Sequence, residues 1–240
     1  MNLRIEKYYW KKGYKMIIGL DEAGRGSLVG PVAAAAATIY PPKFSERKLR
    51  RIHLPKFSER KLRQVNFQEI LKKTKDSKQL TPKQRENIFK LIKKTPEMKF
   101  SCSFIEPRTI DKININKATQ KAMQNCLQKI LKSEVKNIKN KKILILVDGN
   151  QPLSFNYSFL KNKKIFQKTI IKGDSKIFSI ALASIIAKVS RDKKMNILSL
   201  KYPRYKFSLH KGYPTKLHRR LLKKYGPCKM HRRSYKLLND

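Results

Sequence analysis

Short apolar runs and helical periodicities alternate along this chain. Five runs have the length and composition of β-strands, at residues 16–20, 32–40, 98–105, 143–147 and 165–171. Helical spacing of apolar positions predicts helices over residues 82–94, 117–132, 175–191 and 216–225. Strands first, then strands alternating with helices, predict an α/β fold with a mixed central sheet flanked by helices and a C-terminal helical segment.

Two of these helices have recognisable ends. Thr81 is placed as an N-cap before Pro82 at the first helical position, and Gln84 completes a capping box. Thr215 is placed as the N-cap of the last helix, and Gly226 as its stop. These local signals predict where both helices begin.

Acidic residues follow the apolar runs at three places. Asp21 and Glu22 follow the run 16–20, Asp148 follows 143–147, and Asp174 follows 165–171. Acids are scarce, at 16 against 58 Lys and Arg, and a carboxylate at the end of a buried strand is costly unless it is paired or binds a metal. If the first and fourth strands are parallel neighbours, about 4.8 Å apart, Asp21 and Asp148 meet at the sheet edge where open α/β sheets bind ligands.

Each acid also has an ordinary structural interpretation. Asp174 suits a helix N-cap as well as a ligand position. Asp148, followed by Gly149, is typical of a turn. Glu22 is adjacent to Asp21, and successive residues of a straight strand face opposite sides. The two acids therefore share a site only if the strand ends or kinks between them.

The net charge of +42 indicates a polyanionic partner, because neutralising phosphates releases counterions. Part of this excess has a second explanation, since the chain is rich in Lys, Ile and Asn together, as a nucleotide-composition bias would produce. The sign of the charge supports nucleic-acid binding and leaves its strength open.

The organisation of the chain predicts a basic N-terminal extension over residues 1–15. Residues 16–240 are predicted to form one domain, large enough for an enzyme, that includes the C-terminal helical segment. Within that domain, residues 41–72 form a basic insertion in which the sequence PKFSERKLR occurs twice, at 42–50 and again thirteen residues later at 55–63. Two copies are too few for a solenoid. We interpret the duplication as growth of a helical surface insertion, which loop-closure entropy tolerates well.

Cysteine usage and hydropathy bear on the compartment. Cys102, Cys126 and Cys228 are an odd number without a C-x-x-C spacing, which argues against a disulfide framework or a zinc site. No run approaches the roughly 20 apolar residues of a membrane-spanning helix. We therefore expect a cytoplasmic monomer with no membrane partner.

Three short motifs lie between the predicted elements. Gly24, Arg25 and Gly26 follow the first acids and permit close approach of a ligand to the backbone, or form a plain turn. Lys78 suits a phosphate contact or the polar approach to the Thr81 cap. Tyr213, in the sequence HKGY that begins at His210, could stack on a sugar or base of a nucleic acid. The alternative is that this tetrad is a basic surface loop.

Together these fragments resemble ribonuclease HII, the type 2 ribonuclease H of bacteria. The resemblance spans residues 17–235 with every block in order, so chance is a poor explanation. The blocks are G-L-D-E-A-G-R-G from Gly19, G-P-V from Gly30, D-S-K from Asp76, V-D-G from Val147, K-G-D from Lys172, A-S-I-I-A-K-V-S-R-D from Ala183, H-K-G-Y-P-T from His210 and H-R-R-S-Y from His231. Ser27 stands where the family usually has proline, and the gap from Asp148 to Asp174 is longer than usual.

The resemblance implies a ribonuclease H-like fold and a two-metal nuclease using Mn²⁺ or Mg²⁺. Its four catalytic and metal-binding acids map to Asp21, Glu22, Asp148 and Asp174. Its substrate-binding residues map to Gly24, Arg25, Gly26, Lys78 and Tyr213. The implied reaction is cleavage 5′ to a ribonucleotide in duplex DNA, and of the RNA strand of RNA/DNA hybrids, leaving 3′-hydroxyl and 5′-phosphate ends.

Two other function classes remain open. A basic nucleic-acid-binding protein without catalysis predicts tight binding and no cleavage, and the four intact acids disfavour it. A nuclease of the same fold acting on DNA junctions predicts cleavage of substrates with no ribonucleotide.

Overall fold

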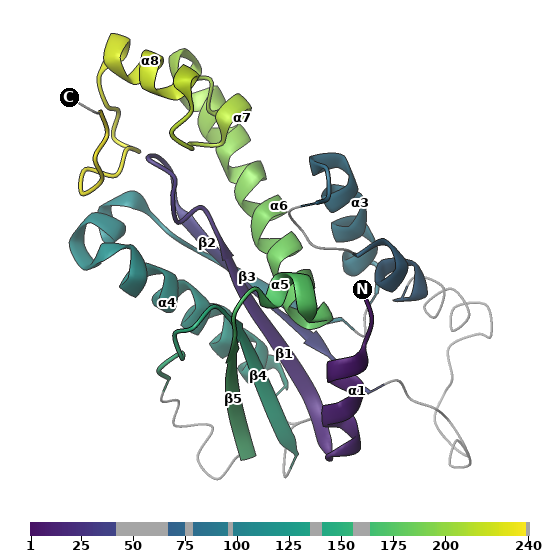
Figure 1. Cartoon of the computed structure of the whole chain (residues 1–240). Helices are drawn as coiled ribbons and strands as arrows, with labels where there is room; N and C mark the ends of the chain where they lie inside the picture. The colour runs from purple at the N-terminus through teal and green to yellow at the C-terminus, as the bar shows by residue number, and fades with distance from the viewer. Residues whose placement is uncertain (42–66, 75–78, 96–97, 135–140, 156–163, 239–240) are drawn as a thin grey trace.

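A five-stranded mixed sheet forms the centre of the computed structural model, which describes residues 1–41, 67–74, 79–95, 98–134, 141–155 and 164–238 (Figure 1). The strands are β1 (Tyr14–Ala23), β2 (Val32–Ile39), β3 (Phe100–Ile105), β4 (Lys142–Asp148) and β5 (Lys164–Ile170). They lie in the order β3-β2-β1-β4-β5. The pairs β1–β2 and β2–β3 are antiparallel, whereas β1–β4 and β4–β5 are parallel. The predicted mixed α/β sheet is confirmed.

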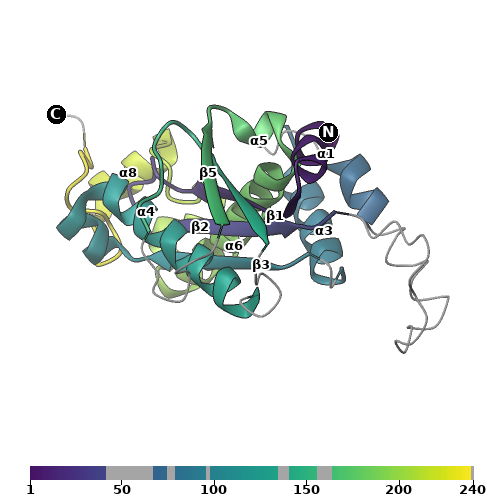
Figure 2. The ribbon, with the colours of Figure 1, turned by 90° about the horizontal axis from the view of Figure 1, so that it is seen from below.

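One helix covers each face of the sheet's centre. The helix α4 (Pro107–Glu134) packs on one face and α6 (Phe178–Lys201) crosses the other (Figures 1 and 2). Alternate residues of β1 divide between the two cores, so that Ile18 faces α4 while Ile17 faces the α6 side. Gly19 allows α6 to approach closely, because a Cβ there would lie 2.2 Å from the backbone of Ser179.

Helix ends with local sequence signals occur where we expected them. The helix α3 (Pro82–Lys93) begins with the complete Thr81–Gln84 capping box. The helix α8 (Lys216–Tyr225) begins at Thr215, whose side chain accepts from the His218 N–H, and ends before Gly226.

Periodicity alone predicted helix extents less well. The predicted helix 117–132 is part of the longer α4, which is kinked at Asn114 (φ 65°). A single helix over 175–191 was wrong, because Ile177 has extended backbone angles and separates the short α5 (Gly173–Lys176) from α6. The apolar pattern continues across this break because Ile177 and Phe178 are both fully buried, so periodicity alone does not reveal the break.

The basic N-terminal segment contains the helix α1 (Arg4–Lys11), which we did not expect. Its Glu6 is fully buried and accepts hydrogen bonds from the backbone N–H (3.0 Å) and hydroxyl (3.2 Å) of Ser179. Ser179 lies in the first turn of α6, whose own N-cap Ile177 has no capping side chain. Glu6 therefore caps α6 from a distant part of the chain.

The chain after α6 forms a small helical layer at one end of the sheet (Figure 1). It comprises the 3₁₀-helix η2 (Pro203–Tyr205), α7 (Phe207–His210) and α8, followed by the C-terminal segment, which we define as residues 226–238. This segment returns to the loop between β1 and β2, where His231 forms an isolated antiparallel bridge with Val29.

Most of the duplicated insertion, residues 42–66, lies outside the described residues, so its predicted helical character stays a prediction. Its end is described: residues 67–73 are helical, and Ile70 is fully buried in the core on the α6 side. Among the described residues, no helix is long and apolar enough to cross a membrane.

Candidate active site

Asp21 and Asp148 lie at equivalent positions on neighbouring parallel strands. The register pairs Leu20 of β1 with Val147 of β4, so the residue that follows each is an aspartate. This confirms the predicted juxtaposition. The predicted strand end at residue 20 was wrong, because β1 continues to Ala23 by pairing with β2. Asp21 and Glu22 thus lie within β1, at the level where β4 ends with Asp148.

Asp21 and Glu22 both lie in the continuous strand β1, so the strand end or kink that we set as the condition for a shared site is absent. Asp21 is 4% exposed on the α6 side, where Ser184 hydrogen-bonds to it. Glu22 is partly exposed, and its backbone N–H donates to the Asp21 Oδ1 at 2.7 Å. The two carboxylates are nevertheless close enough that the charge of Glu22 raises the pKa of Asp21.

The strand-to-helix turn after β5 brings Asp174 to the same edge. The N–H of Gly173 donates to the Asp148 Oδ1 at 2.6 Å, and the next residue, Asp174, is only 2% exposed. The N-cap interpretation of Asp174 is wrong, because Lys172, in the left-handed conformation at φ 55°, occupies the N-cap of α5. The hydrogen bond to Asp148 therefore holds the turn that carries Asp174 at the end of β4 and β5.

Burial and neighbouring acids raise the pKa values of Asp21 and Glu22. Burial raises the pKa of Asp21 well above its ordinary value, and the charges of Glu22 and Asp148 raise it further. Burial also raises the pKa of Glu22, where Arg25 opposes the rise and Asp148 adds to it. Three carboxylates that repel one another at a buried edge form a site that a cation would stabilise.

Oxygen ligands in this arrangement suit a hard divalent cation such as Mg²⁺ or Mn²⁺. As they stand, no three His, Cys, Asp or Glu side chains of the described residues are arranged to hold a metal ion. Asp148 and Asp21 instead accept from the backbone N–H groups of Gly173 and Glu22. The donor set fits a metal in chemistry, and its assignment to the four acids stays a proposal.

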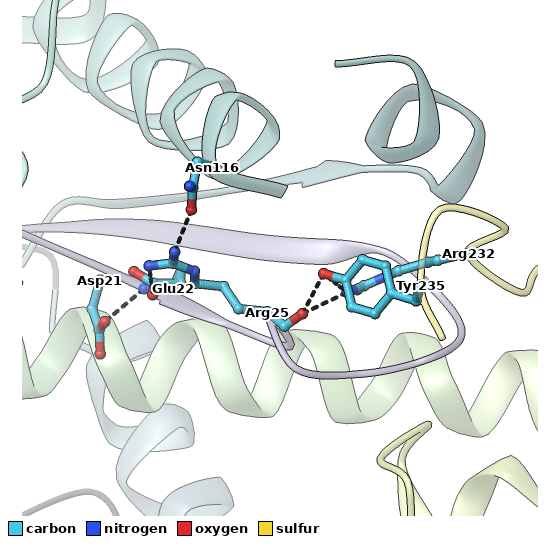
Figure 3. Close-up of polar contacts among 6 residues, drawn as sticks. All are labelled: Asp21, Glu22, Arg25, Asn116, Arg232 and Tyr235. Atoms are coloured by element: carbon cyan, nitrogen blue, oxygen red, sulfur yellow. Dashed lines mark hydrogen bonds and ion pairs between the residues drawn. The ribbon is translucent and has the colours of Figure 1, made fainter. Parts of the chain in front are cut away.

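The predicted glycine motif forms the turn that follows β1. Gly24 has φ +88°, a conformation that L side chains rarely adopt, and a Cβ there would lie 2.0 Å from the Nε of Arg191. Gly26 is exposed, and a Cβ there would meet nothing within 4 Å. The Arg25 side chain turns back to pair with Glu22 at 3.5 Å and to donate to the Asn116 Oδ1 at 2.5 Å (Figure 3). One glycine is thus required by packing, while the other borders open space.

Two buried arginines support this turn, and sequence reasoning assigned them no role. Arg191 of α6 is 1% exposed and donates to the carbonyl oxygens of Pro31, Lys211 and Val29. Arg232 is fully buried and also donates to backbone carbonyls. Burial lowers the pKa of Arg191 to about 10 and lowers the pKa of Arg232. Both residues lie in motifs that carried the family resemblance, which was the available signal.

Tyr213 is exposed close to this turn. It is 43% exposed, its ring lies beside the guanidinium of Arg191 (5.5 Å from the ring centroid), and the neighbouring Gly212 carbonyl accepts from the Leu28 N–H at 2.9 Å. Tyr213 therefore lies on the layer that packs against the glycine turn, as a substrate contact requires. Lys78 lies outside the described residues.

This sheet, its two covering helices and its acid-bearing edge define a protein of the ribonuclease H-like class. Solved structures share the fold. The ribonuclease H2 from Pyrococcus horikoshii OT3 superposes with a TM-score of 0.60 at 24% identity, covering 92% of this chain and 94% of that chain. Bst-RNase HIII in complex with Mn²⁺ superposes with a TM-score of 0.61 at 19% identity, covering 94% of this chain and 68% of that chain.

Sequence comparison narrows the class to one family. The family model described as Ribonuclease HII matches residues 62–238. A Ribonuclease HII of Caldicellulosiruptor bescii is 41% identical over 231 residues, covering 96% of this chain and 91% of the relative. One of Flavobacterium psychrophilum is 39% identical over 235 residues, covering 92% and 91%. The chain belongs to the ribonuclease HII family and is a metal-dependent ribonuclease.

Proposed function

We propose that this protein hydrolyses the phosphodiester bond 5′ to ribonucleotides embedded in duplex DNA, and the RNA strand of RNA/DNA hybrids. The products would be 3′-hydroxyl and 5′-phosphate ends. The observation that carries the proposal is the juxtaposition of Asp21, Glu22 and Asp148 beside a glycine turn that borders open space.

We assign the metal-binding role to Asp21, Glu22, Asp148 and Asp174. Two divalent ions, Mn²⁺ or Mg²⁺, would supply an activated water and charge stabilisation at the leaving oxygen. The residues' own part is to present carboxylate oxygens at a buried edge, where their mutual repulsion favours a cation. The hydrogen bond from Gly173 to Asp148 keeps the turn that carries Asp174 at that edge.

The proposed substrate contacts surround the acids. Gly24, Arg25 and Gly26 would contact the ribose 2′-hydroxyl, the group that distinguishes RNA from DNA. Tyr213 would pack on the neighbouring deoxyribose, and Lys78 would contact a phosphate. The net charge of +42 favours a polyanion over other substrates. That the protein is a cytoplasmic monomer is also part of this proposal.

The test is product mapping on a labelled DNA duplex with one central ribonucleotide, with an all-DNA duplex of the same sequence as control. We expect one metal-dependent nick, 5′ to the ribonucleotide, with a 3′-hydroxyl on the upstream fragment. Cleavage of both duplexes would favour a DNA nuclease of the same fold, and binding of both without a nick would favour a non-catalytic basic protein.

A further inference from the structure

Arg232 is a fully buried cation that donates hydrogen bonds to three carbonyl oxygens of one loop. It donates from Nη2 to the carbonyl oxygen of Gly24 at 2.8 Å, from Nη1 to that of Arg25 at 2.8 Å, and from Nε to that of Gly30 at 3.0 Å. All three acceptors lie between β1 and β2. Burying a guanidinium is costly unless its N–H groups are hydrogen-bonded. Here the planar guanidinium donates from all three nitrogens, and so fixes one loop at three points.

Tyr235 completes this arrangement. Its hydroxyl donates to the Arg25 carbonyl oxygen at 2.7 Å and accepts from the Arg232 Nη1 at 3.1 Å (Figure 3). The Arg25 carbonyl therefore receives two donors from the C-terminal segment. Asp111 of α4 anchors that segment by accepting from the backbone N–H groups of Arg233 and Ser234, each at 3.0 Å.

The direction of these carbonyls determines the direction of the next N–H groups. In a trans peptide the C=O and the following N–H point to opposite sides, and the peptides of this loop are trans. Because the Gly24 and Arg25 carbonyls point to Arg232, the N–H groups of Arg25 and Gly26 point away from it. Arg25 and Gly26 are both exposed while Arg232 is fully buried, so N–H groups that point away from Arg232 point towards the exposed side of the turn.

We infer that Arg232 and Tyr235 are positioning residues for ribonucleotide recognition. By holding two carbonyls on the buried side, they keep the Arg25 and Gly26 N–H groups turned outward, where they can bind a ribose hydroxyl or its adjoining phosphate. Neither side chain touches the substrate. The inference rests on the proposed function, since it explains how the glycine turn is kept ready for a 2′-hydroxyl.

The test compares Tyr235→Phe with Tyr205→Phe. Tyr235→Phe removes one donor to the Arg25 carbonyl and keeps the ring. Tyr205→Phe is a matched control, because that hydroxyl also donates to a backbone carbonyl, the oxygen of Gly226 at 2.7 Å, away from the glycine turn. The readout is the ratio of the dissociation constants for the all-DNA and the one-ribonucleotide duplex, measured by anisotropy with Ca²⁺ as the divalent ion.

We expect Tyr235→Phe to lower this preference about three- to tenfold, as the loss of one hydrogen bond implies. Its affinity for the all-DNA duplex and its Tm should stay close to those of Tyr205→Phe, which keeps the wild-type preference. Arg232→Lys, which cannot reach three carbonyls, should lower the preference further. Wild-type preference in Tyr235→Phe and Arg232→Lys would overturn the inference. A wild-type protein that neither prefers nor cleaves the ribonucleotide duplex would overturn the proposed function, and the inference with it.

Discussion

Replacing Asp21 by Asn should stabilise the fold while abolishing cleavage. Asp21 is 4% exposed, and burial together with the charges of Glu22 and Asp148 disfavours its ionised form. Asn keeps an oxygen that can accept from the Glu22 N–H, which the Asp21 Oδ1 accepts at 2.7 Å. The substitution therefore removes charge repulsion without removing this hydrogen bond.

The size of the effect follows from the strand geometry. Asp148 is on the neighbouring strand at the level of Asp21, so the two carboxylates are separated by about 5 Å. Two charges at that separation repel by about 3 kcal/mol at an effective dielectric constant of about 20. Because partial protonation of Asp21 reduces this repulsion, we expect a gain of about 1–3 kcal/mol in the free energy of unfolding, or about 2–12 °C in Tm.

Thermal unfolding at low salt near neutral pH, with and without Mg²⁺ or Mn²⁺, measures this effect. Without metal, Asp21→Asn should melt above the wild type. Saturating metal should raise the wild-type Tm and close the gap, because only the intact acid set gains binding energy. Glu86→Gln is the matched control: this acid is exposed on α3, pairs with Lys193 at the surface, and should leave Tm and metal response unchanged. An Asp21→Asn protein that melts at or below the wild-type temperature would refute the reasoning.

Three further predictions concern the layer around the glycine turn. Gly24→Ala should cost about 2–4 kcal/mol, because it adds a Cβ at φ +88° 2.0 Å from the buried arginine of α6, whereas Gly26→Ala, which faces open space, should leave Tm nearly unchanged. His218 and His231 are buried 3.2 Å apart with pKa values lowered from 6.5 to about 4. The unfolded chain therefore binds more protons, and Tm should fall as the pH drops from 6.5 towards 4; a flat profile would contradict this. Tyr213→Ala should weaken cleavage at a single ribonucleotide more than it weakens binding of an all-DNA duplex; equal losses would leave Tyr213 a surface aromatic.

Local signals made part of this molecule predictable from sequence. The Thr81 capping box and the Thr215 cap are short-range patterns, and both helices begin there. Two apolar runs that each lead into an acid predicted that Asp21 and Asp148 meet if their strands are parallel neighbours, and β1 and β4 are such neighbours. These features depend on residues close in sequence or on one simple pairing rule.

Features that depend on distant contacts could not be read from the sequence. The extension of β1 to Ala23 depends on pairing with the alanines of β2. In the sequence, two consecutive acids interrupt the apolar run after Leu20, so the run alone predicts a strand that ends there. The burial of Arg232 against the Gly24 turn joins positions 208 residues apart. The resemblance marked such residues as part of motifs, and only the folded chain shows what they contact.

Cleavage of a labelled duplex with one ribonucleotide by wild type, Asp148→Asn and Glu86→Gln tests the central claim most directly. If the acids at the edge of β1 and β4 are the catalytic centre, wild type and Glu86→Gln nick 5′ to the ribonucleotide at similar rates. Asp148→Asn, which should still bind the duplex, leaves it intact. Cleavage by Asp148→Asn at the wild-type rate would contradict the assignment of the active site.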